Sequence, residues 1–253
     1  MTGAAAEQHR SVVVAERLSK RFFNIQALED VSFDLRAGEV HAVVGENGAG
    51  KSTLIKLLVG IHHPDSGRIL LDGHERRFRD PHEALAAGLA VIPQEPRLVP
   101  ALSVAENVLL GHLPGRRLLG VLPLVDRRAL RTQAREALDR LGLPATLDTR
   151  VGTLPYAEQQ LVAIARGLMS RPKLLMIDEP FLGLSPTAVR QILSVVQAIN
   201  KEGVALLFTE QNVELALSVS RRAYVLESGR VALTGRADEV LGHEMVRRVY
   251  LGI

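Results

Sequence analysis

The sequence predicts an α/β fold, and three observations carry this prediction. Short segments rich in β-branched and apolar residues alternate along the chain with segments of helical periodicity. A glycine-rich turn lies directly between one predicted strand and a predicted helix. Hydrophobic residues make up 47% of the 253 residues, which is enough for a sizeable core in one large domain or two small ones. These features indicate a folded globular protein.

The N-terminal part predicts strands at three short runs of β-branched and apolar residues, 12–15, 31–35 and 39–45. A helix is expected over residues 51–59, directly after the glycine-rich turn. Another strand is expected at 68–71, because an Asp-Gly pair, which favours tight turns, follows it.

The middle of the chain predicts helices. Ser103 and Glu106 have the spacing of a capping box, in which two side chains satisfy the first amides of a helix, so a helix is expected to begin there. Residues 125–143 are charged and rich in Arg, Ala and Leu, with apolar residues near helical spacing. Together with its flanks, this stretch predicts a helical subdomain inserted into the sheet.

The C-terminal part predicts two buried strands around a helix. Residues 173–177 and 204–208 are continuous apolar runs, which are typical of strands buried on both faces in a parallel sheet. Between them, Ser185 and Pro186 predict a helix start, because serine caps the first amides and proline suits the first turn.

Composition narrows the class of function. No apolar run reaches the roughly 18 residues that span a bilayer, and residues 1–10, expected to be a disordered N-terminus, have no apolar signal-peptide core. We therefore expect a cytosolic chain unless a partner holds it at a membrane. The absence of cysteine excludes disulfides and thiolate-bound metals. A net charge of +3 with few aromatic residues does not favour nucleic-acid binding.

The strongest chemical signal is the segment GENGAGKST, which matches the phosphate-loop pattern G-x-x-x-x-G-K-S/T between a strand and a helix. In such a loop, glycines let backbone amides turn toward phosphate oxygens and the helix N-terminus adds a positive dipole end. Lys51 is expected to reach the β- and γ-phosphates, and the Ser52 hydroxyl is expected to bind Mg²⁺. The predicted nucleotide-binding residues of this loop are Gly45, Glu46, Asn47, Gly48, Ala49, Gly50, Lys51, Ser52 and Thr53.

A second signal lies at the end of the apolar run 173–177. Asp178 and Glu179 follow it directly, which places two carboxylates at the C-terminal end of a buried strand, where open α/β sheets bind ligands. We expect Asp178 to hold Mg²⁺ through water and Glu179 to polarise the attacking water. The alternative is a strand that merely ends in acidic residues.

With these residues in place, the sequence resembles the ATP-binding cassette (ABC) ATPases over nearly the whole chain. The resemblance implies a P-loop NTPase fold with a mixed sheet core, a small antiparallel β subdomain and an inserted helical subdomain at about 97–170. It also implies a single domain over residues 11–253, with ATP and Mg²⁺ as ligands.

The order of further motifs carries the resemblance. Phe22 sits where the family stacks an aromatic ring on adenine, although Phe23 could serve and an ordinary buried phenylalanine is the alternative. Gln94 matches the glutamine that touches Mg²⁺ and faces the membrane subunit, and Gln211 falls at the switch position that completes the catalytic arrangement. The signature segment, which contacts ATP bound to the opposite subunit, corresponds to Leu154, Pro155, Tyr156, Ala157 and Glu158.

Several of these positions depart from the common family pattern. The usual signature serine is Pro155, its two glycines are Tyr156 and Ala157, the D-loop aspartate is Ser185, and the switch histidine is Gln211. A non-hydrolysing regulatory cassette is therefore an alternative. Against it stand the retained Lys51, Gln94, Asp178 and Glu179.

The resemblance divides over the transported solute. From residue 18 to about 106, segments such as HPDSG and LSVAENVLLG resemble simple-sugar importers, whereas IARGLMSRPKLLMIDEPFLGLSP and EQN resemble branched-chain amino acid importers. We favour a sugar, because that half includes the Gln94 region. The implied partners are a second ABC cassette in a homodimer or heterodimer, transmembrane permease subunits and a solute-binding protein, with the chain at the cytoplasmic face of the cell membrane.

Overall fold

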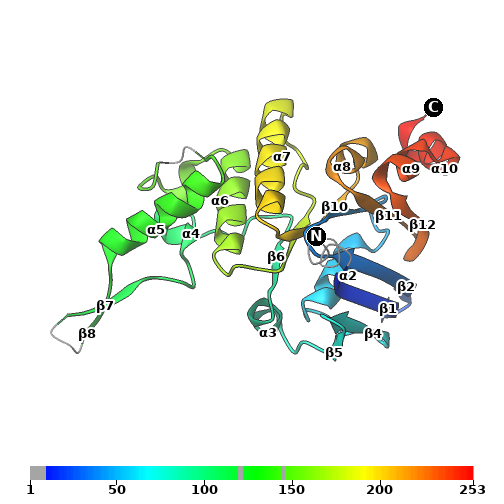
Figure 1. Ribbon diagram of the computed structural model, residues 1–253, viewed down its shortest axis with the longest axis horizontal. Coiled ribbons are helices and arrows are strands. Elements are labelled where there is room, and N and C mark those ends of the chain that lie inside the picture. Colours follow the sequence, from blue (N-terminus) through cyan, green and yellow to red (C-terminus); the bar gives the residue numbers. More distant parts are fainter. Residues whose placement is uncertain (1–9, 119–121, 144–145, 253) are drawn as a thin grey trace, which may run out of the picture.

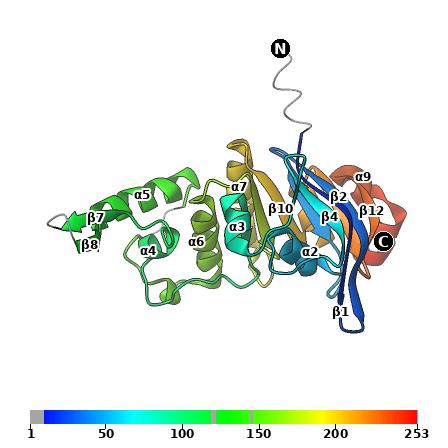
Figure 2. The same ribbon diagram turned by 90° about the horizontal axis from the view of Figure 1, so that it is seen from below.

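The computed structural model describes residues 10–118, 122–143 and 146–252 and forms an α/β fold (Figure 1). The expected disordered N-terminus, residues 1–10, lies outside this range except for Arg10. The two larger sheets and the C-terminal helices lie at one end of the molecule, and helices α4 (Val104–Val108), α5 (Arg127–Arg140) and α6 (Tyr156–Leu168) lie at the other (Figures 1 and 2).

The larger sheet is mixed, as expected, with strand order β12-β11-β3-β10-β9-β6. The strands from β11 to β6 are parallel, and β12 pairs antiparallel with β11. Their bounds are β3 (Val40–Val44), β6 (Leu89–Ile92), β9 (Leu174–Asp178), β10 (Ala205–Glu210), β11 (Arg222–Glu227) and β12 (Arg230–Arg236).

The smaller sheet is antiparallel, with strand order β2-β1-β4-β5. Its first two strands are much longer than the apolar runs that predicted them, because the pairing of β1 with β2 continues, with register shifts, to the turn at Phe22 and Ile25. The bounds are β1 (Ser11–Phe22), β2 (Ile25–Arg36), β4 (Ser66–Leu71) and β5 (His74–Arg76).

The helices begin where side chains can satisfy their first amides. The predicted capping box of α4 is present, since Ser103 and Glu106 bond each other's backbone amides at 3.3 and 2.8 Å. Ser185 caps α7 through Ala188, as predicted. The helices are α2 (Lys51–Leu58), α3 (Pro81–Ala86), α4 (Val104–Val108), α5 (Arg127–Arg140), α6 (Tyr156–Leu168), α7 (Pro186–Lys201), α8 (Val213–Val219), α9 (Ala237–Gly242) and α10 (Glu244–Val246), with a 3-10 turn at Val151–Thr153 and a π-helical turn at Arg247–Leu251.

The stretch 125–143, whose spacing predicted helical structure, contains α5, which begins at Arg127 and ends at Arg140. Asp126 is the N-cap of α5, because its carboxylate accepts hydrogen bonds from the backbone amides of Arg128 and Ala129, both at 3.0 Å. Before it lies an unpredicted hairpin of β7 (Gly115–Leu118) and β8 (Leu122–Val125) at the outer tip of the helical end (Figure 1). The subdomain limits 97 and 170 stay a prediction.

The mixed sheet is buried on both faces. Along β9, Leu175 and Ile177 join the core beneath α7 and α8, whereas Leu174 and Met176 join the core beneath α2 and the antiparallel sheet. Side chains of a strand alternate between its faces, so two apolar cores require the continuous apolar run seen in the sequence.

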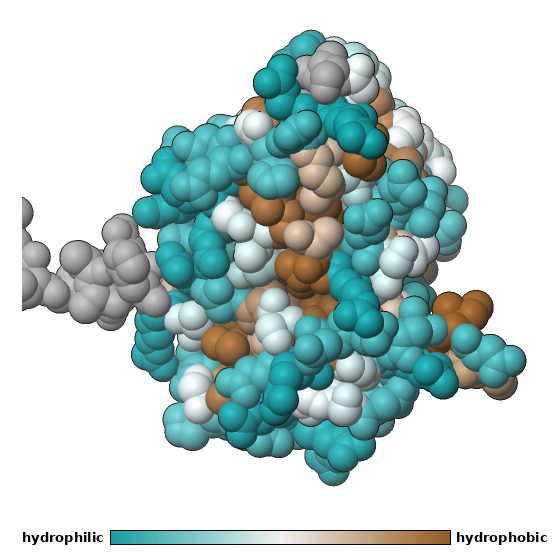
Figure 3. All heavy atoms as spheres, turned by 90° about the vertical axis from the view of Figure 1, so that its right-hand side faces the viewer, coloured by the Kyte–Doolittle hydropathy of each residue, from teal (hydrophilic) through white to brown (hydrophobic). Residues whose placement is uncertain are grey.

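The face in Figure 3 is mostly hydrophilic but carries an apolar strip bordered by hydrophilic residues. Within the described ranges, no helix combines the length and the apolar character needed to cross a membrane.

Candidate functional site

The loop between β3 and α2 is built around glycines with positive φ, a conformation that residues with a side chain rarely adopt. Gly50, the N-cap of α2, has φ of 104°, and a Cβ there would lie 2.5 Å from the carbonyl oxygen of Ala27. Gly48 has φ of 81° and a Cβ would meet nothing within 4 Å. The loop therefore closes tightly against β2 on one side and stays open on the other.

Lys51, the first residue of α2, is a buried cation held by this loop. Its Nζ donates to the carbonyl oxygens of Gly45 at 2.9 Å and Glu46 at 3.1 Å, and lies 3.5 Å from Oε1 of Glu179. Only 4% of the residue is exposed. An ammonium group can be buried only with such partners, so the loop holds a fixed positive charge where phosphate is expected.

Oxygen atoms converge on the end of β9. The hydroxyls of Ser52 and Thr209 both donate to Oδ1 of Asp178, at 3.1 and 2.5 Å. The register of the parallel strands pairs Thr209 with Asp178 and brings them together. The hydroxyl of Ser52 and the carboxylate of Asp178 are the hard oxygen donors that Mg²⁺ prefers, so these residues fit a magnesium site. Thr209 was not predicted from the sequence.

Glu179, which follows β9, has a strained backbone with φ of 50° and is 6% exposed. Its amide donates to the carbonyl oxygen and to Oγ1 of Thr209, at 3.1 and 3.2 Å. Such strain costs on the order of 1–3 kcal/mol and persists where surrounding contacts impose it, as at many functional sites.

Gln211 joins three segments at the end of β10. Its Nε2 donates to both carboxylate oxygens of Glu179 at 3.2 Å and to Oδ1 of Asn47 at 2.7 Å. Because β10 lies between β3 and β9, its carboxyl end is the natural place for a side chain that reaches both.

Glu210 is a site residue that the sequence reasoning missed. It is 4% exposed, and its carboxylate accepts the backbone amides of Phe181 at 2.9 Å and Gln211 at 3.2 Å. Burial raises its pKa from 4.5 to about 7; the two amide hydrogen bonds oppose this rise and the charge of Glu179 adds to it. The signal available in the sequence was an acidic residue placed between the apolar run 204–208 and the predicted switch residue Gln211.

Of these groups, Lys51, Ser52, Glu179 and Gln211 line an open pocket of about 380 Å³. Most of the phosphate-loop residues line it, together with Gln94 from the end of β6. Ile25, Ala27 and Leu182 line it too and were not predicted. The lining residues are Ile25, Ala27, Asn47, Gly48, Gly50, Lys51, Ser52, Thr53, Gln94, Glu179, Leu182 and Gln211.

Phe22 is not among the residues that line this pocket. Its ring packs edge-to-face on His62, with ring centroids 4.9 Å apart, and Nζ of Lys20 lies 5.5 Å from its centroid. Phe23 is 98% exposed, and Ile25 is 71% exposed at the pocket. The structure therefore brings Ile25, rather than Phe22, to the phosphate loop.

The predicted signature residues 154–158 do not line the pocket either. Pro155 is the N-cap of α6 and Tyr156 opens that helix with 41% exposure. Residues 154–158 therefore do not contribute to this pocket within one subunit. Ser185 has a capping role at α7, where its hydroxyl accepts the amide of Ala188 at 3.3 Å.

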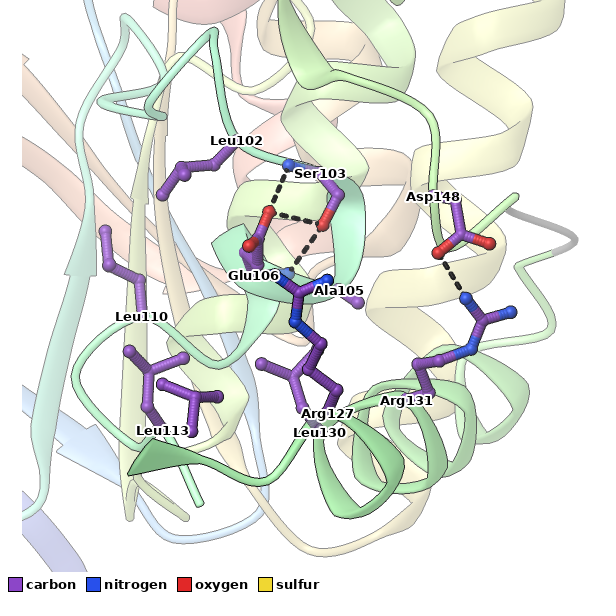
Figure 4. A pocket seen from close by; sticks show the side chains of 11 residues that line it. Leu102, Ser103, Ala105, Glu106, Leu110, Leu113, Arg127, Leu130, Arg131 and Asp148 are labelled. Carbon is purple, nitrogen blue, oxygen red and sulfur yellow. Dashed lines mark hydrogen bonds and ion pairs between the residues drawn. The ribbon is translucent and has the colours of Figure 1, made fainter. Parts of the chain in front are cut away.

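A second pocket, of about 400 Å³, lies between α4 and α5 (Figure 4). Leucine side chains form its apolar wall, and at its rim Arg131 forms an ion pair with Asp148. The wall includes Leu102, Leu110, Leu113 and Leu130.

The comparisons with known proteins agree with this geometry. A family profile described as "ABC transporter" matches residues 28–182. "Ribose import ATP-binding protein RbsA 1" of Rubrobacter xylanophilus is 42% identical over 243 residues, covering 96% of this chain and 47% of that protein. "Arabinose import ATP-binding protein AraG" of Chromohalobacter salexigens is 41% identical, covering 90% of this chain and 45% of that protein. The chain spans about half the length of the curated relatives it matches.

Solved structures are similar over nearly the whole chain. An ATP-binding cassette of an ABC transporter in its ADP conformation has a TM-score of 0.84 at 28% identity, covering 96% of this chain and 99% of that one. The cbiO1 protein from Clostridium perfringens, described as part of the ABC transporter complex cbiONQ, has a TM-score of 0.80 at 28% identity, covering 96% of both chains.

Proposed function

The chain belongs to the ABC transporter family of ATP-binding cassettes, and we propose that it binds and hydrolyses ATP to drive solute uptake. One observation carries the proposal: a buried lysine, a strained buried glutamate and the switch glutamine meet at one pocket. Lys51 reaches it from the start of α2, and Glu179 and Gln211 reach it from the carboxyl ends of β9 and β10.

Each residue has a distinct role in this proposal. Lys51 supplies positive charge to the phosphates, and the loop amides supply hydrogen-bond donors. Glu179 orients the attacking water and accepts its proton, while Gln211 holds both oxygens of that carboxylate. Mg²⁺, when bound, neutralises phosphate charge, with Ser52, Asp178 and Gln94 as the residues that would hold it.

Hydrolysis is favoured over a regulatory cassette that only binds nucleotide. The water-orienting carboxylate is retained and held in place by Lys51 and Gln211, although the signature segment departs from the family pattern.

Adenine is proposed to stack near the β1–β2 turn, where Phe23 and Ile25 are exposed and Phe22 is packed on His62.

Glu179→Gln tests the proposal most directly. The amide keeps the shape of the carboxylate but cannot accept the proton of water, so we expect ATP binding to be retained and hydrolysis to be lost. Binding of a fluorescent ATP analogue and phosphate release report the two steps separately. Lys51→Ala is the companion variant and should lose tight binding. Wild-type turnover by Glu179→Gln would show that Glu179 has another role.

The solute is proposed to be a simple sugar. The relatives at about 40% identity are named for ribose, arabinose and galactose import. The nucleotide pocket of the cassette cannot identify the solute, so the test of the solute class uses the complete transporter. In vesicles, ATP hydrolysis should be stimulated by a ribose-loaded solute-binding protein and not by a leucine-loaded one; the opposite result would assign the branched-chain amino acid class.

We propose three kinds of partner: a second cassette, transmembrane permease subunits and a solute-binding protein. A similar protein described as part of an ABC transporter complex supports assembly with other transporter subunits. The permease is proposed to meet the surface between Gln94 and the pocket of Figure 4, where Leu113 and Val125 are each 43% exposed. This would hold the chain at the cytoplasmic face of the membrane.

A further inference from the structure

Glu210, the last residue of β10, binds two backbone segments at once through its carboxylate. Oε1 accepts the amide of Phe181 at 2.9 Å, and Oε2 accepts the amide of Gln211 at 3.2 Å. Only 4% of Glu210 is exposed. A buried carboxylate is costly without hydrogen-bond donors, so these two bonds fix the side chain and join the two segments.

The first segment carries the residue that is proposed to orient water. Glu179 lies two residues before Phe181 and has the strained φ of 50°. Its amide donates to the carbonyl oxygen and to Oγ1 of Thr209, at 3.1 and 3.2 Å. Strand β10 therefore holds this turn at two points, at the strained residue through Thr209 and two residues later through Glu210. Such strain persists only where neighbouring contacts impose it.

The second segment carries the predicted switch residue. Nε2 of Gln211 donates to both carboxylate oxygens of Glu179 at 3.2 Å. The backbone amide of the same Gln211 is bound by Glu210, which also binds the chain just after Glu179. One buried carboxylate thus sets the separation of the two backbones whose side chains meet at the pocket.

We propose that Glu210 is a positioning residue for hydrolysis, which holds Glu179 and Gln211 at the separation where the Glu179 carboxylate can orient water. Glu210 is not among the residues that line the nucleotide pocket, so it acts through the two segments that it joins. Loss of its second acceptor should slow the chemical step and leave ATP affinity, which depends on the phosphate loop, unchanged. This inference rests on the proposed function.

Glu210→Gln tests the role of the second acceptor. Glutamine keeps the size of the side chain but has one acceptor oxygen, so its amide group faces one of the two backbone amides. The assay is run at pH 8, above the pKa of about 7 that burial gives Glu210, where the parent carboxylate is ionised. We expect kcat for ATP hydrolysis to fall roughly tenfold to a hundredfold, as for loss of a hydrogen bond to a charged group. The dissociation constant of a fluorescent ATP analogue should not change.

Glu39→Gln is the matched control. Glu39 is also 4% exposed, but it precedes β3, at the end of the parallel strands opposite to Glu210. Its carboxylate lies 3.6 Å from Nε2 of His41 and 3.5 Å from Nε of Arg221. This variant removes the same charge from an equally buried glutamate, so kcat should stay at the parent value whatever happens to the thermal unfolding midpoint. An equal fall of kcat in both variants would make Glu210 a structural residue only and would overturn the proposal.

Amide hydrogen exchange in the nucleotide-free protein tests the geometry without hydrolysis. The amides of Phe181 and Gln211 should exchange slowly in the parent, and at least one of them should exchange faster in Glu210→Gln. Rapid exchange of the Phe181 amide in the parent would overturn the proposal even if the variant did not fold.

A double-mutant cycle tests whether Glu210 acts through Gln211 and Glu179. Glu210→Gln should lower kcat less in the Gln211→Ala background than in the parent, because the arrangement that it supports is already lost there. Full additivity, or an unchanged kcat in Glu210→Gln alone, would overturn the positioning role. A failure of the proposed function is distinguishable, because the parent itself would then hydrolyse no ATP, and the positioning role would fall with it.

Discussion

Gln211 is the side chain that ties the candidate catalytic groups together, because one amide nitrogen contacts both Glu179 and Asn47. Removing it frees the carboxylate that is proposed to orient water. We expect Gln211→Ala to lower the hydrolysis rate at saturating ATP by roughly tenfold to a thousandfold, with a smaller effect on ATP affinity. Steady-state phosphate release and equilibrium binding measure the two.

Gln211→His is the matched variant. It restores the residue usual in the family and adds an imidazole, so it should retain substantial activity and gain a pH dependence at about 6.5 that the parent lacks. Parent-like turnover by Gln211→Ala would leave Gln211 as an ordinary polar residue at the end of a strand.

Glu210 should make the stability of the protein depend on pH. Burial raises its pKa from 4.5 to about 7, so between these values the folded protein keeps a proton that the unfolded chain loses. The contribution of Glu210 to the free energy of unfolding should therefore fall as pH rises from 4.5 to 7. Relative to Glu210→Gln, which cannot titrate, the parent should lose roughly 1 to 3 kcal/mol over this window. Urea unfolding at pH 5 and pH 7.5 measures the difference, and equal values at both would contradict the assignment.

At the scale of single elements, helix α4 depends on its capping box. It has five residues, too few for a stable isolated helix, so its stability depends on the hydrogen bonds between Ser103 and Glu106 at its start. Ser103→Ala should lower the free energy of unfolding by about 1 kcal/mol, measured by urea titration. Ser194→Ala, in the exposed interior of α7, is the control and should be neutral or slightly stabilising. Equal losses in both variants would show that the cap does not stabilise α4.

At the scale of the whole molecule, residues 154–158 do not line the nucleotide pocket of their own subunit. We expect a complete site to need two subunits placed head to tail, with Lys51 of one facing residues 154–160 of the other. ATP and Mg²⁺ should therefore double the mass of the Glu179→Gln protein in light scattering, because this variant is expected to bind ATP without hydrolysing it. A monomer at every concentration would point to an obligate heterologous partner.

The sequence by itself determined the phosphate loop, the Asp178–Glu179 pair and the buried strands. Each is a local pattern: glycines and a lysine at fixed spacing, or a continuous apolar run ending in acids. The capping residues Ser103 and Ser185 were also local and were predicted, because a cap bonds amides only three residues away. The β7–β8 hairpin was not predicted from the sequence.

Only the tertiary structure decided which distant residues meet. Parallel pairing sets the register of Thr209 with Asp178 and of Glu210 with Val44, so three strand ends distant in sequence supply one site. It also brought Ile25 rather than Phe22 to the pocket, and Tyr156 to the carbonyl of Gln94, 62 residues away. Residue spacing cannot reveal these neighbours, because sheet order and helix packing are settled by burying two apolar faces at once.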